Sequence, residues 1–458
     1  MKPISKIRFD ALAGYARMPM ARVMAEELGW YEYANERVLG MLFRDRTDGD
    51  YAGLIFGRDR RGRYRSVSMS DFDISRRHAE VLLRRELERM GLLNDEQFHQ
   101  GDEQGKPIDF FAPAAPRERL NPGFVGLSES KGYGAARRII EPMMRWYEDP
   151  DGNFIEQFQT TGFDTRLWEL YLFAAVTEMG YLIDREHAFP DFGCYGPLGE
   201  FAVEATTVGP SRNGTLAQGP DLETDAGRKA FLREYMPMKF GGPLFDKLRK
   251  EYWKLPHVID KPLVFAIADF QGGAMMTISA SALPIYLYGY TWDWEKKGDE
   301  PLKIIPQKVA QHTWGGKVIP SGFFDLPEAE NVSAVLFSNA ATISKFVRMG
   351  TIAGFGTPDV RIFRAGTAVN LDPNATEPLH FDLEVTDPTY TEDWVEGLEV
   401  FHNPQALNPL EPWRLPGASH HRLLPDGQIQ TWQPDWVPLA SVTRILEIEG
   451  DGSNAAAG

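Results

Sequence analysis

Hydrophobic and polar positions in the middle of the chain follow first a helical and then a strand-like spacing. Residues 164–180, DTRLWELYLFAAVTEMG, place apolar side chains at helical intervals and end in glycine, which predicts a helix. Three strand candidates follow closely, at 181–189, 190–196 and 200–208. An amphipathic helix is then predicted over 241–255 and a buried, almost wholly apolar strand over 261–270. The predicted order is helix, three strands, helix, strand.

The flanking regions have different patterns. Residues 37–69 read as strands separated by Asp-Gly and Arg-Gly turns, and residues 75–91 read as a helix that ends at a glycine. A polar stretch rich in proline and glycine, 94–134, predicts a linker or a long surface loop. A strand and a helix are expected within 332–350, and short strands within 378–386 and 428–434.

These patterns predict an α/β protein with three parts: an α+β N-terminal domain over 1–135, a core over 136–350 and a β-rich region over 351–458. The final residues, 451–458, are expected to form a frayed tail.

Composition narrows the class of protein. The 458 residues are 43% hydrophobic, which is enough for a large core. Cys194 is the single cysteine, so an internal disulfide and a zinc site built from several thiolates are excluded. The N-terminus lacks the apolar segment of a signal peptide, and no uninterrupted apolar run reaches the length of a membrane span. We therefore expect a cytoplasmic protein with no membrane contact.

Charge is distributed unevenly along the chain. The formal net charge is −16, yet residues 1–90 carry four more Lys and Arg than Asp and Glu. Within that part, GRDRRGRYR concentrates arginines around Tyr64, a composition that suits a phosphate backbone with an exposed base. The competing interpretation is a solvated hairpin turn. The candidate nucleic-acid-binding residues are Arg58, Arg60, Arg61, Arg63 and Arg65.

Three carboxylates are candidates for chemistry. Glu169 lies in a helical segment that is apolar almost all round, so it needs a partner, and Arg166 on the same helix face is the structural alternative. Asp191 and Glu204 are 13 residues apart, enough for one strand to turn and return beside its neighbour. Together with the carbonyl of Ala205 they would offer the oxygen ligands that Mg²⁺ or Mn²⁺ takes. Such an ion activates water for phosphodiester hydrolysis.

The order of these pieces resembles the PD-(D/E)xK nucleases, the restriction-endonuclease-like superfamily with an αβββαβ core. The similarity covers roughly residues 140–290. It implies that Asp191 and Glu204 bind a divalent metal ion and that Glu169 assists them. It also implies that the protein can act as a homodimer or with a partner protein.

One motif position departs from that family. Where the pattern has a lysine two residues after the strand glutamate, this chain has Thr206, which carries no charge. The replacement cation is predicted to come from the following helix, with Lys247 and Lys250 as candidates. The spacing of Lys247, Lys250 and Lys254 places them along one side of that helix, although solvation is the alternative for each.

The sequence therefore predicts a metal-dependent endonuclease, with DNA as the expected substrate and bacterial defence or restriction as a role implied by the resemblance alone. The first alternative is a catalytically silent protein of the same fold that binds nucleic acid or a partner, which Thr206 favours. The second is an enzyme of another class whose site is built around His402 and His420. The adjacent His420 and His421 are otherwise expected in a loop, and His402 in a turn.

Overall fold

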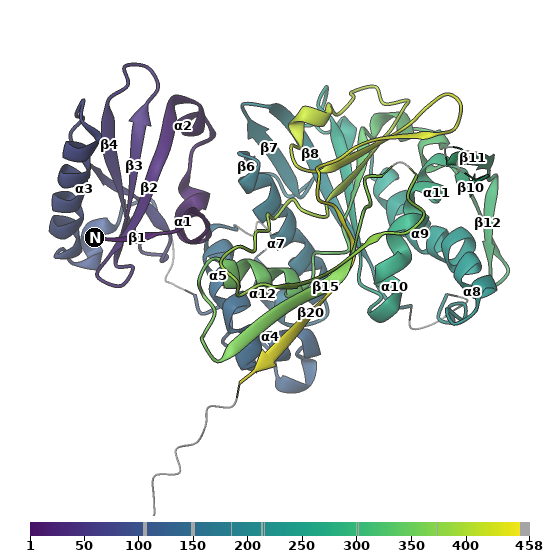
Figure 1. The fold of residues 1–458 in the computed structure, drawn as a ribbon, viewed down its shortest axis with the longest axis horizontal. Helices are drawn as coiled ribbons and strands as arrows, with labels where there is room; N and C mark the ends of the chain where they lie inside the picture. The colour runs from purple at the N-terminus through teal and green to yellow at the C-terminus, as the bar shows by residue number, and fades with distance from the viewer. Residues whose placement is uncertain are drawn as a thin grey trace, which may run out of the picture.

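The computed structural model describes residues 1–103, 108–147, 152–184, 186–211, 214, 216–298, 300, 302–372 and 374–448. The predicted tail, 451–458, lies outside this set. The described residues form a mixed α/β protein with several sheets (Figure 1). None of its helices combines the length and apolar character needed to span a lipid bilayer.

The N-terminal part is an antiparallel sheet with a helix across one face, seen at the left of Figure 1. Its five strands lie in sequence order: β1 (Lys2–Ile4), β2 (Ala25–Tyr33), β3 (Val38–Asp45), β4 (Tyr51–Arg58) and β5 (Tyr64–Met69). The helix is α3 (Arg76–Gly91), which begins because the Ser75 side chain accepts a hydrogen bond from the backbone N–H of His78. Leu83 and Leu87, one turn apart, pack against the sheet with no solvent exposure.

Short helices connect this sheet to the core. They are α1 (Lys6–Ala13), α2 (Pro19–Met24), α4 (Pro122–Glu129), α5 (Gly134–Trp146) and α6 (Phe154–Gln159). The prediction of a linker over 94–134 is wrong at α4. The Asn121 side chain accepts from the Gly123 amide, Pro122 fits the first helical turn, and Phe124 is buried, so this segment folds as a capped helix.

An eight-stranded sheet forms the core, in the order β19-β18-β17-β14-β9-β8-β7-β6. Strands β6, β7 and β8 form an antiparallel meander, whereas β9 runs parallel to both β8 and β14. The bounds are β6 (Leu182–Asp184), β7 (Phe192–Gly196), β8 (Gly199–Val208), β9 (Leu263–Asp269), β14 (Ala334–Phe337), β17 (Glu399–His402), β18 (Ser419–Leu423) and β19 (Ile429–Trp432). Residues after 350 thus complete the same sheet as the central residues.

Helices cover both faces of this sheet. On one face lie α7 (Phe163–Glu178) and α12 (Ile343–Ile352), whose Trp168 and Phe346 join one hydrophobic core. On the other lie α9 (Met236–Leu248) and α11 (Leu283–Tyr288), whose Phe240 and Leu287 join a second core. Asp164 marks the start of the predicted helix and would suit its N-cap, but α7 already begins at Phe163, so Asp164 lies within its first turn. The remaining helices are α8 (Asp225–Ala230) and α10 (Gly273–Ile278).

The elements predicted for the centre of the chain occur in the predicted order, α7, β6, β7, β8, α9, β9, with the unpredicted helix α8 between β8 and α9. Three further small sheets surround it. Two are hairpins, β10 (Tyr290–Glu295) with β11 (Lys303–Lys308), and β12 (Gln311–Trp314) with β13 (Lys317–Pro320). The third joins β16 (Leu379–Glu384), β15 (Val360–Ala368) and β20 (Pro438–Glu447).

Candidate functional site

Asp191 and Glu204 meet where β7 and β8 separate. The last residue pair of the β7–β8 ladder is Phe192 with Val203, so the residues of β8 that follow Val203 have no β7 backbone partner on that side. The Asp191 carboxylate takes that place and accepts a hydrogen bond from the Ala205 amide, with N to Oδ2 at 2.7 Å. In return, the Asp191 amide donates to Glu204 Oε2 at 3.3 Å. The two residues therefore lie side by side at this point of the sheet, each carboxylate bonded to a backbone amide of the opposite segment; their sharing of a metal ion stays a prediction.

Lys247 and Tyr252 hold the Glu204 carboxylate from the α9 side of the sheet. The Lys247 ammonium and the Tyr252 hydroxyl both donate to Glu204 Oε1, each at 2.5 Å. Glu204 is only 1% exposed, so this ion pair is shielded from water. A cation from the following helix therefore stands beside the strand glutamate, as predicted for Lys247. Tyr252 is a residue that sequence reasoning missed, because nothing in its local sequence distinguishes its buried hydroxyl.

Glu169 approaches from α7 on the other side of the sheet. Its Oε2 accepts hydrogen bonds from the Arg166 guanidinium and from the Tyr147 hydroxyl, both at 2.7 Å. The ion pair with Arg166, the structural alternative, is thus present. Tyr147, at the end of α5, is a second residue that sequence reasoning missed, since it comes from a segment with no motif.

The pKa of Asp191 reports the crowding of negative charge. Burial, together with repulsion from Glu204 and Glu169, raises it to about 7, a net value that already includes the opposing effects of the Ala205 amide and the Lys247 charge. A carboxyl group whose ionisation is opposed in this way is a frequent mark of a functional site. Within the described residues, no hydrogen bond reaches the second oxygen, Oδ1.

Lys250 and Lys254 are not part of this cluster. Helix α9 ends at Leu248 and Glu251 adopts a left-handed φ of 51°, so the predicted single helical face through all three lysines is wrong. Lys250 is exposed and its Nζ lies 5.7 Å from the centre of the Phe189 ring. Lys254 pairs with Glu251 at 2.7 Å.

Few side chains near Asp191 and Glu204 could bind a metal ion. Among the residues that the structure describes, no three His, Cys, Asp or Glu side chains gather as a metal-binding group. Two carboxylates and the nearby backbone of Ala205 are what this part of the sheet can offer. An ion here would therefore have to keep several water ligands, as Mg²⁺ commonly does.

The arginine-rich segment is the turn between β4 and β5, so the hairpin interpretation is correct. Buried Asp59 organises it: Arg63 Nε donates to its Oδ2 at 2.8 Å, and the backbone amides of Arg61 and Arg63 donate to its Oδ1. Arg65 pairs with Asp102 at 2.6 Å, and Arg58 lies over the Tyr64 ring.

The hairpin also borders open space on one side. A cavity of about 750 Å³ is lined in part by Arg61, Arg63 and Arg65 together with Trp146. Arg60 is exposed at the tip of the turn. Nucleic-acid binding by these arginines stays a prediction, although Arg63 is committed to Asp59.

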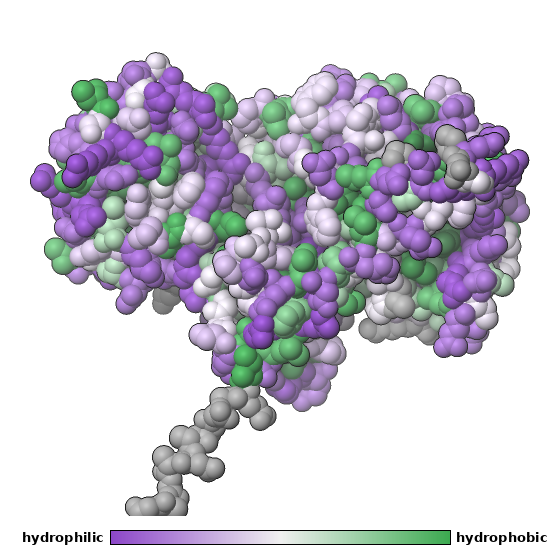
Figure 2. All heavy atoms as spheres, viewed as in Figure 1, coloured by the Kyte–Doolittle hydropathy of each residue, from purple (hydrophilic) through white to green (hydrophobic). Residues whose placement is uncertain are grey.

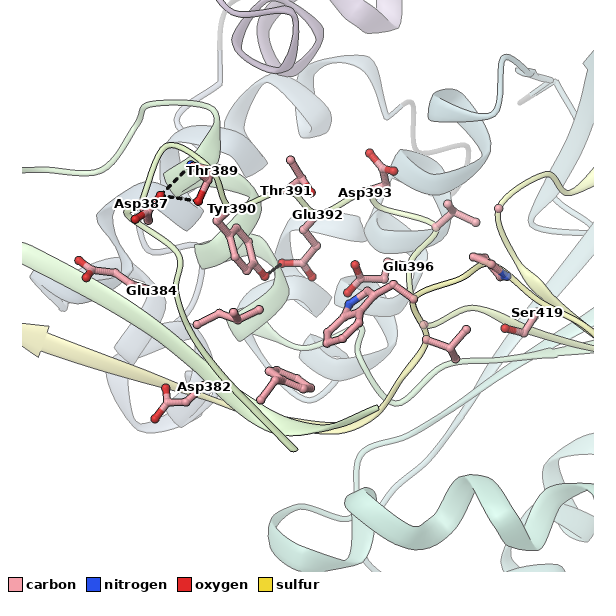
Figure 3. A pocket seen from close by; sticks show the side chains of 18 residues that line it. Asp382, Glu384, Asp387, Thr389, Tyr390, Thr391, Glu392, Asp393, Glu396 and Ser419 are labelled. Carbon is pink, nitrogen blue, oxygen red and sulfur yellow. Dashed lines mark hydrogen bonds between the residues drawn. The ribbon is translucent and has the colours of Figure 1, made fainter. Parts of the chain in front are cut away.

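Another cavity of similar size lies elsewhere. It has a volume of about 720 Å³ and sits beside β16, and its lining includes none of the predicted site residues (Figure 3). Glu392 at its floor is bonded to Lys345, Arg348 and the Tyr390 hydroxyl, and Glu396 pairs with Arg364. These two carboxylates belong to a buried ionic network that ties α12 and β15 to the loop before β17, which is a structural role.

The histidines of the C-terminal region do not form a pocket of their own. His402 ends β17 and His420 lies in β18, and their rings bond to each other, Nε2 to Nδ1, at 2.9 Å. Both are buried, 3% and 5% exposed. His420 Nε2 donates to the Leu415 carbonyl, so its Nδ1 accepts from His402. The predicted loop and turn are wrong here, because both histidines lie in strands.

The comparisons with known proteins are negative. No family model, no curated protein and no solved structure matches this chain. The site is therefore interpreted from its own chemistry.

Proposed function

We propose that this chain is a metal-dependent nuclease with a restriction-endonuclease-like core, acting on DNA. The observation that carries the proposal is the meeting of Asp191, Glu204 and Lys247 at the point where β7 and β8 separate. The element order around them is further support, since α9 connects the parallel pair β8 and β9 and β6 to β8 form a meander. The proposal requires a carboxylate on β8, a cation on α9 and a carboxylate directly before β7, and these are Glu204, Lys247 and Asp191.

Two features of this site fit a divalent cation. The raised pKa of Asp191 reflects its burial and its negative neighbours Glu204 and Glu169, and a divalent cation bound there would offset that repulsion. Asp191 Oδ1 also has no hydrogen bond among the described residues. Asp191 and Glu204 would hold the ion. When bound, it would stabilise charge on a phosphate oxygen and make a water more acidic.

The chain's own residues have distinct tasks in this proposal. Lys247 supplies the positive charge that Thr206 cannot, and its ammonium is positioned for an oxygen of the phosphate or of the attacking water. The Tyr252 hydroxyl holds the Glu204 carboxylate in place, so that Glu204 Oε1 stays within hydrogen-bond distance of the Lys247 ammonium. Glu169 adds negative charge from the far side of the sheet, held in place by Arg166 and Tyr147.

A second function is favoured by one specific observation. Glu204 already satisfies its oxygens with Lys247, Tyr252 and the Asp191 amide, and no three-ligand group occurs among the described residues. This is the arrangement expected of a protein that keeps the fold for binding nucleic acid or a partner and does not cut. The two functions differ in whether the Asp191–Glu204 pair binds an ion.

The test is cleavage of plasmid DNA and of single-stranded DNA in Mg²⁺ or Mn²⁺, with EDTA as the metal-free control. Asp191→Ala and Glu204→Ala are compared with the wild type and with Asp246→Ala, an exposed acidic residue on α9. The nuclease proposal expects metal-dependent cutting that is lost in the first two variants and kept in the third. Folded wild-type protein that cuts neither substrate in either metal contradicts it.

A further inference from the structure

A small aromatic and basic surface borders the proposed site. We call it the rim and define it as His187, Phe189, Lys250 and His257. Phe189 lies two residues before Asp191, and its side chain is 50% exposed. Its ring centre is 6.5 Å from that of Tyr252, whose hydroxyl bonds to Glu204. The rim is therefore in direct contact with a residue that holds the candidate catalytic carboxylate.

The rim is held together by specific contacts. The rings of His187 and His257 stack with centres 3.9 Å apart and planes 17° from parallel. The ring Nε2 of His257 lies 2.7 Å from the Phe189 carbonyl, so it donates there, and this bond fixes the segment that precedes Asp191. Contacts of this kind position a surface ring before any ligand arrives, which lowers the entropy cost of binding.

Charge on the rim favours an anionic ligand. Lys250 Nζ lies 5.7 Å from the centre of the Phe189 ring, and among the described residues no carboxylate is within ion-pair distance of it. On this side Asp184 Oδ2 lies 3.4 Å from His187 Nδ1, and the exposed Glu186 precedes His187 in the chain. A free ammonium group beside an exposed aromatic ring matches a nucleotide, which presents a phosphate and a flat base together.

We propose that the rim stacks an unpaired base, so that the substrate class of this site is single-stranded nucleic acid. This inference rests on the proposed nuclease function. Bases in a duplex hide their faces in the helical stack, whereas a single strand offers them to a protein ring. Phe189 would stack a base while Lys250 meets the neighbouring phosphate, and the strand would then pass Asp191 and Glu204.

The experiment measures binding by fluorescence anisotropy in EDTA, where no cutting occurs. The probes are labelled oligothymidylate, oligouridylate and a blunt DNA duplex of equal length. The variants are Phe189→Ala, Phe189→Trp and Phe72→Ala, the last a matched control because Phe72 is 45% exposed in the N-terminal part. We expect Phe189→Ala to weaken binding of both single strands about tenfold or more, with a change of less than about twofold for the duplex. Phe189→Trp restores binding, and Phe72→Ala changes none of it.

Two results overturn the inference. One is a Phe189→Ala variant that binds the single strands as the wild type does. The other is an equal loss for single strands and duplex, which would mean a general loss of affinity. Either result alongside metal-dependent cleavage that needs Asp191 leaves the nuclease proposal standing. Wild-type protein that cleaves no substrate would instead overturn the proposed function on which the inference depends.

Discussion

Lys247 is proposed to supply the positive charge that the nuclease motif places on the strand, two residues after the glutamate. It comes from a helix and not from the strand that carries Glu204, and its ammonium reaches the carboxylate across the α9 face of the sheet. Lys250, three residues later, lies beyond the end of α9 and faces Phe189. Sequence spacing does not distinguish the two lysines. The end of α9 at Leu248 does, because Lys247 lies inside the helix and Lys250 lies beyond it.

The two lysines are expected to differ in activity. Lys247→Met should slow single-turnover cleavage by about 10²–10⁴-fold, because the charge beside the reacting phosphate is lost. Lys250→Met should slow it by less than about tenfold at saturating protein, since that residue acts in binding. Equal rates for the two variants, measured at the same protein concentration, would contradict the assignment.

At the scale of elements, the pairing of β17 with β18 explains the buried histidines. The two strands run in parallel, with Val400 opposite His420. The imidazoles of His402 and His420 are hydrogen-bonded to each other between them. Burial, together with the neighbouring His420 and Arg422, lowers the pKa of His402 to about 3. The folded protein therefore keeps this ring neutral.

This pair is expected to make the fold sensitive to acid. The unfolded chain binds a proton on His402 below about pH 6.5, whereas the folded chain does not until about pH 3. Stability therefore falls as the pH drops through this window, by roughly 3 kcal/mol at pH 4 for this group. Urea unfolding at pH 7 and pH 4 should show a smaller loss for His402→Gln than for the wild type or for His99→Gln, an exposed control. The same loss in all three would refute the link.

Local patterns specified the central elements but not their partners. Helix α7 and strands β8 and β9 carry continuous apolar signals, and each forms close to where its signal lies. Strands β15 and β20 lie far apart in the sequence and neither shows a clear alternation, so their pairing depends on contacts that no local window contains. Convergence of Asp191 and Glu204 followed from strand order, whereas Tyr147 and Tyr252 join the site only through tertiary packing.

At the scale of the whole molecule, positive charge is concentrated in the N-terminal part of an acidic protein. Figure 2 shows this part as a largely hydrophilic surface beside the core. Within the β4–β5 hairpin, the arginines divide by function: Arg63 holds Asp59, and Arg60 is exposed to solvent. Arg60 can bind a phosphate without breaking a contact of the fold, whereas Arg63 would first have to leave Asp59.

Two hairpin variants should separate these roles. Arg60→Ala is expected to weaken nucleic-acid binding by a similar factor for all sequences and to reduce the salt dependence of log K by about one. Arg63→Ala is expected to lower the free energy of unfolding by about 3 kcal/mol, because it removes the nearer cation of the buried Asp59 carboxylate, and Arg65 lies farther away, at 4.0 Å. The checks are anisotropy at several salt concentrations and chemical denaturation. A salt slope unchanged in Arg60→Ala would exclude the hairpin from the nucleic-acid surface.

Asp191 and Glu204 are proposed to share a divalent ion, and calorimetric titration with Mn²⁺ measures that binding without relying on cleavage. The variants are Asp191→Asn, Glu204→Gln and Asp393→Asn, the last an exposed carboxylate of the separate cavity in Figure 3. We expect the wild-type chain to bind one Mn²⁺. Its affinity should be at least about tenfold weaker in Asp191→Asn and Glu204→Gln and unchanged in Asp393→Asn. Folded wild-type protein that binds no Mn²⁺, or binding that is lost only in Asp393→Asn, would contradict it.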